Sequence, residues 1–201
     1  NIKLELHNWN VDFAAWCSYK YMNSGPGNVS GYFVHEKHHK NKDLTRLAGW
    51  WGHNKERRFL MEPNFDPVEG AEGWQVSNLP ILSLAPYLAS VEMFDEIGMD
   101  TLIEKRNKIT AYLEFILHEI DKEVDSTFEI ITPANQEERG CQLSVFLHGE
   151  GRSLFDWLMK NGVITDWREP NVIRLAPVPL YTSYEDIYQF GQLLKKGILA
   201  T

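Results

Sequence analysis

The pattern of apolar and polar positions in the first forty residues predicts two short strands joined by a tight turn. Apolar and aromatic residues predominate at positions 11–19 and again at positions 30–34, a composition typical of β-strands. Between these runs stands Asn23-Ser24-Gly25-Pro26-Gly27, where glycine and proline force the chain to reverse. Residues 37–76 show little periodicity and much Gly, Pro, Trp and charge. We therefore expect a long loop region there, of a kind that is often functional.

From residue 79 onward the apolar positions recur at helical spacing. The pattern predicts one helix from residue 79 to Gly98, where glycine suits the C-cap, and a second helix over residues 100–123. The elements expected after them are strands at 128–131 and 141–147, a helix at 151–161 closed by Gly162, strands at 163–166 and 172–175, and a last helix at 183–199. Ser183 is the expected N-cap of that last helix, because Ser183-Tyr184-Glu185-Asp186 has the form of a capping box.

Composition and charge limit the classes of partner. The chain has 201 residues, 43% of them hydrophobic, which indicates a folded domain, or a small domain with part of another. A formal net charge of -8 argues against a nucleic-acid partner, and the basic clusters at 37–42 and 55–58 are expected to be solvated loops. The apolar run at residues 79–91 is broken by Pro80 and Pro86. It falls short of the roughly 20 apolar residues that span a bilayer, so we expect no membrane partner.

Cysteine and histidine positions indicate neither a disulfide framework nor a metal site. Cys17 and Cys141 lie far apart without a C-x-x-C spacing, which fits a reducing compartment, and we expect a cytoplasmic protein. His35, His38 and His39 invite interpretation as metal ligands. Histidines on a polar loop without an acidic third ligand more often lie in solvent, so we expect no metal.

One lysine stands out by its position. Lys20 follows the apolar run of the first predicted strand, and such a strand would carry it into a protein interior. Burial disfavours the ammonium form and makes a lysine amine available as a nucleophile that forms a Schiff base with a carbonyl. The alternative is a lysine that extends from the strand end into water.

Five ordered segments carry a family resemblance: W-C-S-Y-K-Y at 16–21, G-W-W-G-H at 49–53, V-S-N-L-P-I-L at 76–82, E-E-R-G-C-Q-L at 137–143 and I-R-L-A-P-V-P-L-Y at 173–181. Together they resemble kynureninase, a pyridoxal 5'-phosphate (PLP) enzyme of the aspartate-aminotransferase fold type, over nearly the whole chain. The resemblance implies an α/β fold of PLP-dependent transferase fold type I. Residues 1–98 would then be the end of the large mixed-sheet PLP-binding domain, with an active-site loop and a linking helix, and residues 99–201 the small C-terminal α/β domain.

The resemblance also implies an activity. Kynureninases use PLP to hydrolyse L-kynurenine or 3-hydroxykynurenine to anthranilate or 3-hydroxyanthranilate and L-alanine, in tryptophan catabolism and NAD biosynthesis, and they are homodimers with shared active sites. The family's Asp that pairs with the pyridine nitrogen and its Thr-containing phosphate loop cannot be matched in this chain. The sequence therefore looks like the C-terminal part of a longer enzyme, and we expect residues 1–201 alone to be inactive.

The resemblance assigns the cofactor-binding residues. Lys20 is the expected Schiff-base and proton-transfer residue, and Tyr19 is expected to hydrogen-bond the PLP phosphate and relay a proton. Trp50 and Asn78 match positions that contact the phosphate across a subunit boundary. Without the neighbouring lysine, Tyr19 would equally be interpreted as a buried sheet aromatic. The alternative for Trp50 is an exposed tryptophan that anchors an interface.

The substrate-binding residues follow from the same resemblance. Arg174 interrupts an apolar strand, and a planar guanidinium fits a carboxylate bidentately. The family uses an arginine here for the substrate α-carboxylate, whereas the alternative is a salt bridge to a protein carboxylate. Trp51 and His53, with Asn78, fall where the family builds the pocket for the aromatic end of kynurenine.

Two other functions stay open. A different PLP enzyme of the same fold, such as a cysteine desulfurase or an aminotransferase, would share the lysine and the arginine, although the aromatic loop at 49–53 argues against it. The chain could also serve only as a dimer-forming piece. Bound cofactor, visible in an absorption spectrum, distinguishes an enzyme from an empty scaffold.

Overall fold

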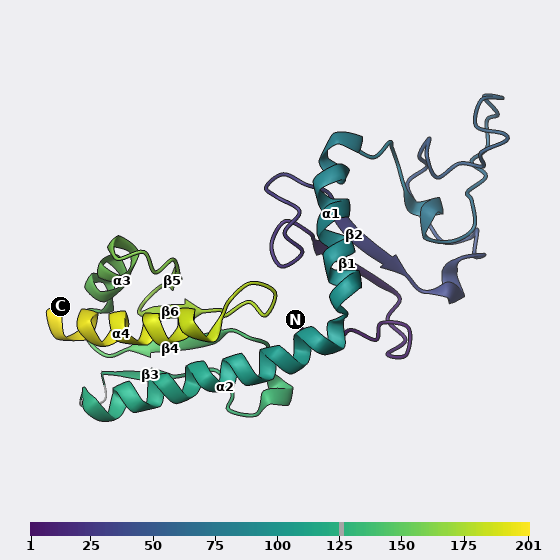
Figure 1. Cartoon of the computed structure of the whole chain (residues 1–201). Helices are drawn as coiled ribbons and strands as arrows, with labels where there is room; N and C mark the ends of the chain where they lie inside the picture. Colours follow the sequence, from purple (N-terminus) through teal and green to yellow (C-terminus); the bar gives the residue numbers. More distant parts are fainter. Residues whose placement is uncertain (125–126) are drawn as a thin grey trace. The chain divides into compact units, whose positions relative to one another are not determined.

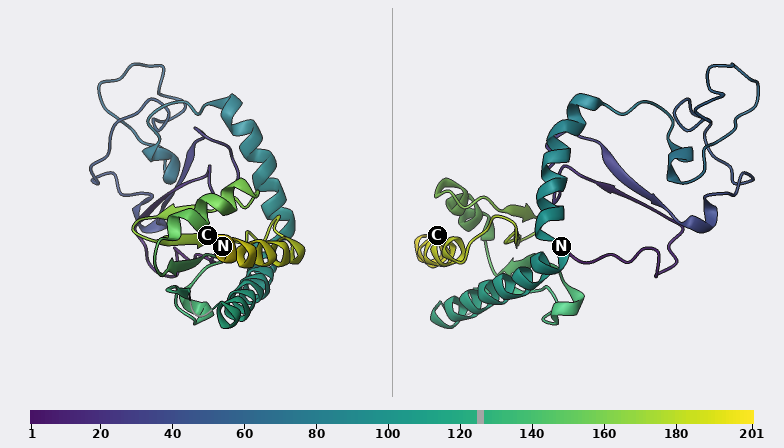
Figure 2. Two further views of the ribbon diagram at one scale, coloured as in Figure 1. Left: turned by 90° about the vertical axis from the view of Figure 1, so that its left-hand side faces the viewer. Right: turned by 45° about the vertical axis from the view of Figure 1, so that its right-hand side comes forward.

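The structure, a computed structural model, describes residues 1–124 and 127–201. The chain divides into two compact units (Figures 1 and 2). The first, Leu4–Glu96, holds two strands and a long loop region and is called the loop unit below. The second combines Asn1–Lys3 with Ile97–Thr201 and is called the sheet unit. The first residues join the sheet unit through Asn1, whose Oδ1 accepts a hydrogen bond from the backbone N–H of Cys141 at 3.1 Å.

The loop unit is built on an antiparallel pair of strands, β1 (Phe13–Cys17) and β2 (Ser30–Val34). Both strands fall inside the predicted ranges. Trp16 lies opposite Gly31, and a Cβ added at Gly31 would lie 2.5 Å from the indole ring. Glycine at this strand position therefore leaves room for the neighbouring tryptophan.

Helix α1 (Ile81–Ile97) follows the loop region and confirms the helix predicted from residue 79. It packs on the turn after β1, because Ser90 Oγ donates to the Met22 carbonyl at 2.5 Å and the rings of Phe94 and Tyr21 lie 5.6 Å apart. Gly98 follows the helix with φ +77, the left-handed conformation that favours glycine.

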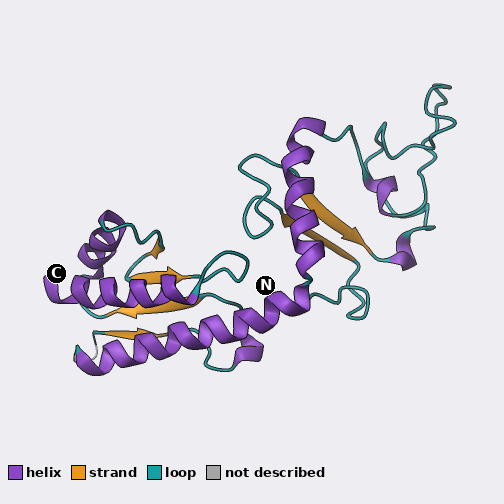
Figure 3. Ribbon diagram, in the orientation of Figure 1, coloured by secondary structure: helices purple, strands orange, loops and turns teal. Residues whose placement is uncertain are grey.

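The segment between β2 and α1 is a loop region, as the sequence predicts, and Figure 3 shows it almost without regular structure. It contains only two short 3-10 turns, η1 (Glu36–His38) and η2 (Ala71–Trp74), among the described residues. Its order comes from backbone contacts and buried polar side chains rather than from helices or strands.

The expectation that the three loop histidines lie in solvent is wrong. His35 is buried, and its Nδ1 accepts the Lys37 backbone N–H as the N-cap of η1. His38 Nε2 lies 2.8 Å from the Asp12 carboxylate, and His39 Nε2 lies 3.0 Å from the Val34 carbonyl. Each ring is held by a group distant in sequence or on the backbone, which the local pattern does not reveal. Within the described residues no three His, Cys, Asp or Glu side chains are placed to hold a metal ion.

The sheet unit contains a four-stranded antiparallel sheet in the order β3-β4-β6-β5. Its strands are β3 (Phe128–Ile130), β4 (Leu143–Leu147), β5 (Asp166–Arg168) and β6 (Val172–Leu175), with the turn η3 (Gln136–Glu138) before β4. Its helices are α2 (Met99–Glu123), α3 (Gly151–Lys160) and α4 (Tyr184–Ala200).

The sheet unit follows the predicted order of elements with one shift. Residues 163–165 were expected in a strand, but β5 begins at Asp166. The backbone N–H of Val163 instead bonds the Leu158 carbonyl at 3.0 Å, and Gly162 has φ +83. Residues 162 and 163 therefore close the end of α3 before a strand can begin.

The core of the sheet unit lies between the sheet and the helices. On β4, Leu143, Val145 and Leu147 are buried and alternate with half-buried residues, the pattern of a strand with one face in the core. Burying each such side chain contributes about 1.5–3 kcal/mol. The buried members of this core are Ile109, Leu113, Leu117, Ile120, Phe128, Leu143, Val145, Leu147, Leu154, Leu158, Ile173, Leu175, Ile187 and Leu194.

Helix α4 begins with the predicted capping box. Ser183 Oγ accepts the Asp186 N–H at 3.1 Å, and Asp186 Oδ2 accepts the Ser183 N–H at 2.7 Å. A Cβ at Gly191 would lie 2.5 Å from Ile116, so glycine allows α4 to approach α2 closely. Among the residues that the structure describes, no helix is long and apolar enough to cross a membrane.

Candidate active site

Lys20 and Tyr19 lie on the bend that follows β1. The bend is anchored by Ser18, which is fully buried and whose Oγ lies 2.7 Å from Ser24 Oγ. Tyr19 is 45% exposed, Lys20 is exposed, and the lysine Nζ lies 5.7 Å from the centroid of the Tyr19 ring. The predicted burial of Lys20 is therefore wrong. The alternative that Tyr19 is a buried sheet aromatic is wrong as well. The reason is that β1 ends at Cys17 and residues 18–20 form a bend, so Lys20 lies outside the strand.

The aromatic loop and the segment that carries Asn78 come together in the loop unit. A Cβ at Gly49 would lie 2.3 Å from the Val76 Cα, and the Gly52 N–H donates to the Gln75 carbonyl at 2.7 Å. Two motifs separated in the sequence thus share one backbone junction. It places the Trp50–His53 loop against the residues just before Asn78, whose own side chain is exposed.

Arg58 stabilises the aromatic loop through hydrogen bonds to its backbone. Its Nη2 donates to the carbonyls of Trp51 and His53, both at 3.0 Å, and its guanidinium lies 4.9 Å from the Trp51 ring centroid. The side chain is buried, so the expectation that this basic cluster is solvated is wrong for Arg58. It holds for the adjacent Arg57, which is half-exposed and pairs with acidic side chains. Nothing in the local sequence separates the two arginines, and sequence reasoning missed Arg58.

A cavity of about 310 Å³ lies beside this loop. Most of its wall is formed by Trp50, His53, Arg58 and residues 61–65. The His53 ring lies 5.7 Å from the Phe65 ring, and its Nδ1 accepts the Asp66 backbone N–H at 3.1 Å. Trp50 and Trp51 are 45% and 39% exposed, so their rings also offer open apolar surface.

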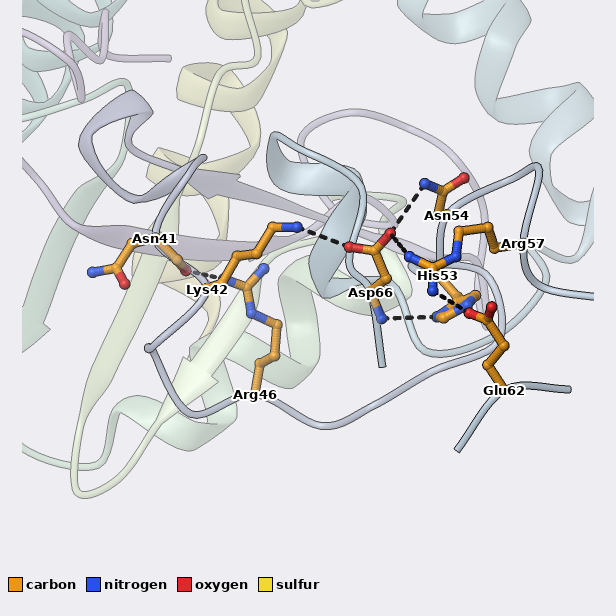
Figure 4. Close-up of polar contacts among 8 residues, drawn as sticks. All are labelled: Asn41, Lys42, Arg46, His53, Asn54, Arg57, Glu62 and Asp66. Atoms are coloured by element: carbon orange, nitrogen blue, oxygen red, sulfur yellow. Dashed lines mark hydrogen bonds and ion pairs between the residues drawn. The ribbon is translucent and has the colours of Figure 1, made fainter. Parts of the chain in front are cut away.

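Asp66 is the centre of a polar network beside the cavity (Figure 4). Its carboxylate accepts hydrogen bonds from Lys42 Nζ at 2.8 Å and from Asn54 Nδ2 and Arg57 Nη1, both at 3.1 Å. The Lys42 hydrogen bond, followed by that of Asn54, lowers the pKa of the Asp66 carboxyl below its ordinary value. Arg57 also pairs with Glu62. Sequence reasoning did not single out Asp66, because its partners come from separate parts of the loop.

Arg174 belongs to the sheet unit. It lies opposite Asp166 in the β5–β6 register, and its Nε donates to Asp166 Oδ2 at 2.5 Å. Arg174 Nη2 reaches the same oxygen, and Arg168 Nε lies 3.1 Å from it. The salt bridge that the sequence left open as an alternative is therefore present. The Arg174 side chain is still 32% exposed, so part of the guanidinium is accessible.

The chain is similar in sequence to a known domain family and to curated proteins. Residues 105–194 match the kynureninase C-terminal domain. The chain is 84% identical over 199 residues to the kynureninase of Flavobacterium johnsoniae. This alignment covers 99% of this chain and 47% of that protein. It is 52% identical over 192 residues to the kynureninase of Koribacter versatilis, covering 96% of this chain and 45% of that protein.

Solved structures with the same fold are more distant in sequence. A C-DES mutant with glycine covalently linked to its PLP cofactor has a TM-score of 0.72 at 16% identity, covering 95% of this chain and 48% of that chain. An alanine–glyoxylate aminotransferase from Nostoc sp. has a TM-score of 0.66 at 19% identity, covering 98% of this chain and 50% of that chain. These likenesses confirm the α/β fold of PLP-dependent fold type I.

The identity to kynureninases is high, whereas the identity to the C-DES and aminotransferase structures is low. The chain spans about half the length of the curated relatives that it matches. The chain is similar to kynureninases over nearly its whole length, and its residues 105–194 match the kynureninase C-terminal domain.

Proposed function

We propose that the protein containing this chain is a PLP-dependent hydrolase that cleaves L-kynurenine, or 3-hydroxykynurenine, to L-alanine and anthranilate or 3-hydroxyanthranilate. The observation that carries this proposal is the 84% identity to a curated kynureninase over 99% of the chain. The cavity beside the aromatic loop adds a place for an aromatic substrate. In this role the protein acts in tryptophan catabolism and NAD biosynthesis.

The residues of the loop unit fit PLP. Lys20 is exposed, and its Nζ lies near the Tyr19 ring with no carboxylate partner among the described residues, so its amine is free to hold the cofactor aldehyde. Tyr19, Trp50 and Asn78 are exposed donors that would hydrogen-bond the phosphate. When bound, PLP supplies the electron sink for bond cleavage next to the substrate amine. Lys20 would then also move protons at the substrate Cα.

Arg174 would bind the substrate α-carboxylate. Asp166 engages the guanidinium through Nε and Nη2, while a guanidinium carries five N–H donors in all. Because the side chain is partly exposed, donors remain for a second carboxylate. A bidentate contact of this kind fixes the orientation of the substrate as well as its affinity.

Trp51 and His53, with Asn78, would receive the aromatic end of the substrate. Trp51 offers a ring face that Arg58 holds in place, and His53 lies on the cavity wall. Stacking on a rigid indole suits an aromatic amine, and the imidazole supplies polar recognition. The comparison of kcat/KM for kynurenine and 3-hydroxykynurenine decides which substrate this pocket prefers.

A homodimer with shared sites is part of the proposal. The loop region and the start of α1 expose large apolar side chains, with Leu47 79%, Phe59 75%, Met61 78%, Ile81 80% and Leu82 91% exposed. Exposed apolar surface of this extent marks an interaction site. We also propose the domain roles of residues 1–98 and 99–201 given by the resemblance. Both cysteines are free, which supports a reducing cytoplasmic location.

The test is to purify the protein with PLP and to record its visible absorbance and its turnover of kynurenine. Release of fluorescent anthranilate, together with the absorbance of bound cofactor, supports the proposal. Cysteine desulfuration or transamination without kynurenine cleavage would assign the protein to another PLP activity. A protein without bound cofactor or turnover would support the alternative of a dimer-forming piece.

A further inference from the structure

His53 and Asp66 lie on two backbone segments that form a short antiparallel ladder. His53 pairs with Pro67 in an isolated bridge. On either side of it, the Asn54 N–H donates to the Asp66 carbonyl at 2.8 Å, and the Val68 N–H donates to the Gly52 carbonyl at 2.9 Å. The position of His53 on the cavity wall therefore depends on the segment that contains Asp66.

The imidazole of His53 is fixed in one tautomer. Its Nδ1 lies 3.1 Å from the backbone nitrogen of Asp66, whose N–H can only donate. Nδ1 must therefore accept with its lone pair, and the neutral ring carries its proton on Nε2. Nε2 has no hydrogen-bond partner within the described part of the chain. The ring thus retains one unused N–H donor on a residue that lines the cavity.

The Asp66 side chain fixes the backbone that holds this tautomer. Lys42, Asn54 and Arg57 all donate to its carboxylate, and they come from three places in the loop (Figure 4). The lowered pKa of Asp66 agrees with a carboxylate that these donors stabilise in its charged form. Loss of the carboxylate would leave three donors without their common acceptor.

The main chain of His53 has a second support besides this ladder. Arg58 Nη2 donates to the His53 carbonyl at 3.0 Å, while the Asp66 N–H acts on the ring. A change at Asp66 can therefore release the ring while the loop stays in place. This separation makes the role of Asp66 testable without loss of the fold.

We propose that Asp66 is a positioning residue that presents His53 to the cavity as a neutral Nε2–H donor for the aryl carbonyl oxygen of the substrate. The proposal rests on the proposed function. The aryl carbonyl is the substrate group that matches a fixed donor, because the neighbouring aniline nitrogen is itself chiefly a donor. Water addition places negative charge on that carbonyl oxygen, so the hydrogen bond strengthens as the reaction proceeds.

The first experiment measures the tautomer directly. In the PLP-loaded protein labelled with nitrogen-15 histidine, long-range proton–nitrogen spectra distinguish a protonated from an unprotonated ring nitrogen, and His53→Gln assigns the signal. We expect His53 with a bare Nδ1 and a protonated Nε2. A proton on Nδ1, or exchange between both tautomers, would overturn the proposal.

The second experiment removes the carboxylate. Asp66→Ala should mix the tautomers of His53 and lower kcat for kynurenine by about tenfold or more with a smaller change in KM, because a misplaced donor loses transition-state stabilisation. Asp66→Asn keeps one acceptor oxygen and should lie between wild type and Asp66→Ala. Glu69→Ala is the matched control: this exposed acid of the same loop pairs only with Lys40, at 4.0 Å, among the described residues, and should change neither readout.

The outcomes separate the two proposals. Asp66→Ala with a lower melting temperature but an unchanged His53 tautomer and unchanged kcat would assign Asp66 a structural role only. If Asp66→Ala does not fold, Lys42→Ala and Asn54→Ala each remove a single donor and should shift both readouts in the same direction. A wild-type protein that does not cleave kynurenine would refute the proposed function, while the tautomer measurement would still decide what fixes His53.

Discussion

Arg174 on β6 lies directly opposite Asp166 on β5 and donates to its carboxylate. The pairing gives a charged strand residue a protein partner before any substrate is present. It also orients the guanidinium, because Nε and Nη2 both face one carboxylate oxygen. An arginine held in this way needs less reorganisation to receive a second carboxylate.

The proposed carboxylate receptor predicts the effect of Arg174→Lys. An ammonium cannot reproduce two parallel hydrogen bonds, so kcat/KM for kynurenine should fall by about two orders of magnitude or more. Steady-state kinetics measure it. Arg168→Lys is the control, since Arg168 pairs with the same aspartate but is 60% exposed, and it should have little effect. Unchanged kinetics for Arg174→Lys would leave Arg174 as a structural salt bridge.

The proposed Schiff-base residue predicts the effect of Lys20→Ala. Turnover should be abolished while the unfolding free energy changes by no more than about 0.5 kcal/mol, because the side chain is exposed. Lys20→Arg keeps the charge but should be equally inactive. Borohydride reduction of the PLP-loaded protein and peptide mapping should label Lys20, and a label on another lysine would contradict the assignment.

The ion pair of Arg139 and Glu114 predicts a large loss of stability. Arg139 is nearly fully buried and donates to the Glu114 carboxylate through both Nη atoms, one of which also reaches the Pro133 carbonyl. Arg139→Met should lower the free energy of unfolding by about 3–5 kcal/mol, because the glutamate keeps its charge without its partner. Denaturant titration measures the loss. Adding Glu114→Leu should recover part of it, and no recovery would show that the pair itself is not responsible.

The same pair predicts a pH dependence. The Arg139 hydrogen bond lowers the pKa of Glu114 below its ordinary value of 4.5. The unfolded chain then binds a proton at higher pH than the folded chain does, so the pair's stabilisation is present above pH 4.5 and is lost as the pH falls below it. Denaturant midpoints measured from pH 6 downward, about the range where carboxylates titrate, should fall less steeply in Glu114→Gln. Identical slopes would place the acid sensitivity in other groups.

The capping box predicts the effect of Ser183→Ala. The substitution removes the acceptor for the Asp186 N–H at the start of α4, and should lower the free energy of unfolding by about 1 kcal/mol. Ser183→Asn retains an N-cap acceptor and should be nearly neutral. Thermal unfolding followed by circular dichroism compares the two variants. Equal losses in both would argue against the cap as the cause.

Local features were predictable where the signal lies within one element. The apolar stripe of α2, the alternation on β4 and the capping box of α4 all appear in the sequence, because a helix turn or a strand pleat places neighbouring residues on one face. The start of β5 was misplaced by three residues, because the turn after α3 used the residues expected in the strand.

The candidate site shows what the sequence could not supply. The family resemblance identified Lys20, Trp51, His53 and Arg174 as candidates. It did not predict that Gly49 lies against Val76, or that the Asp66 carboxylate accepts hydrogen bonds from three side chains. Those contacts join segments distant along the chain, so no local propensity encodes them. The exposure of Lys20 and the burial of Arg58 were likewise decided only by the folded chain.

The adjacent residues Arg57 and Arg58 show why a sequence does not determine the partners of a side chain. The sequence by itself determined the residue types, their local periodicity and the resemblance to a family. Only the tertiary structure decided that Arg57 reaches outward to Glu62 while Arg58 lies buried under Trp51 and His53. Backbone carbonyls and carboxylates can both accept hydrogen bonds from a guanidinium. Which acceptor it bonds depends on the groups that the fold brings within hydrogen-bonding distance.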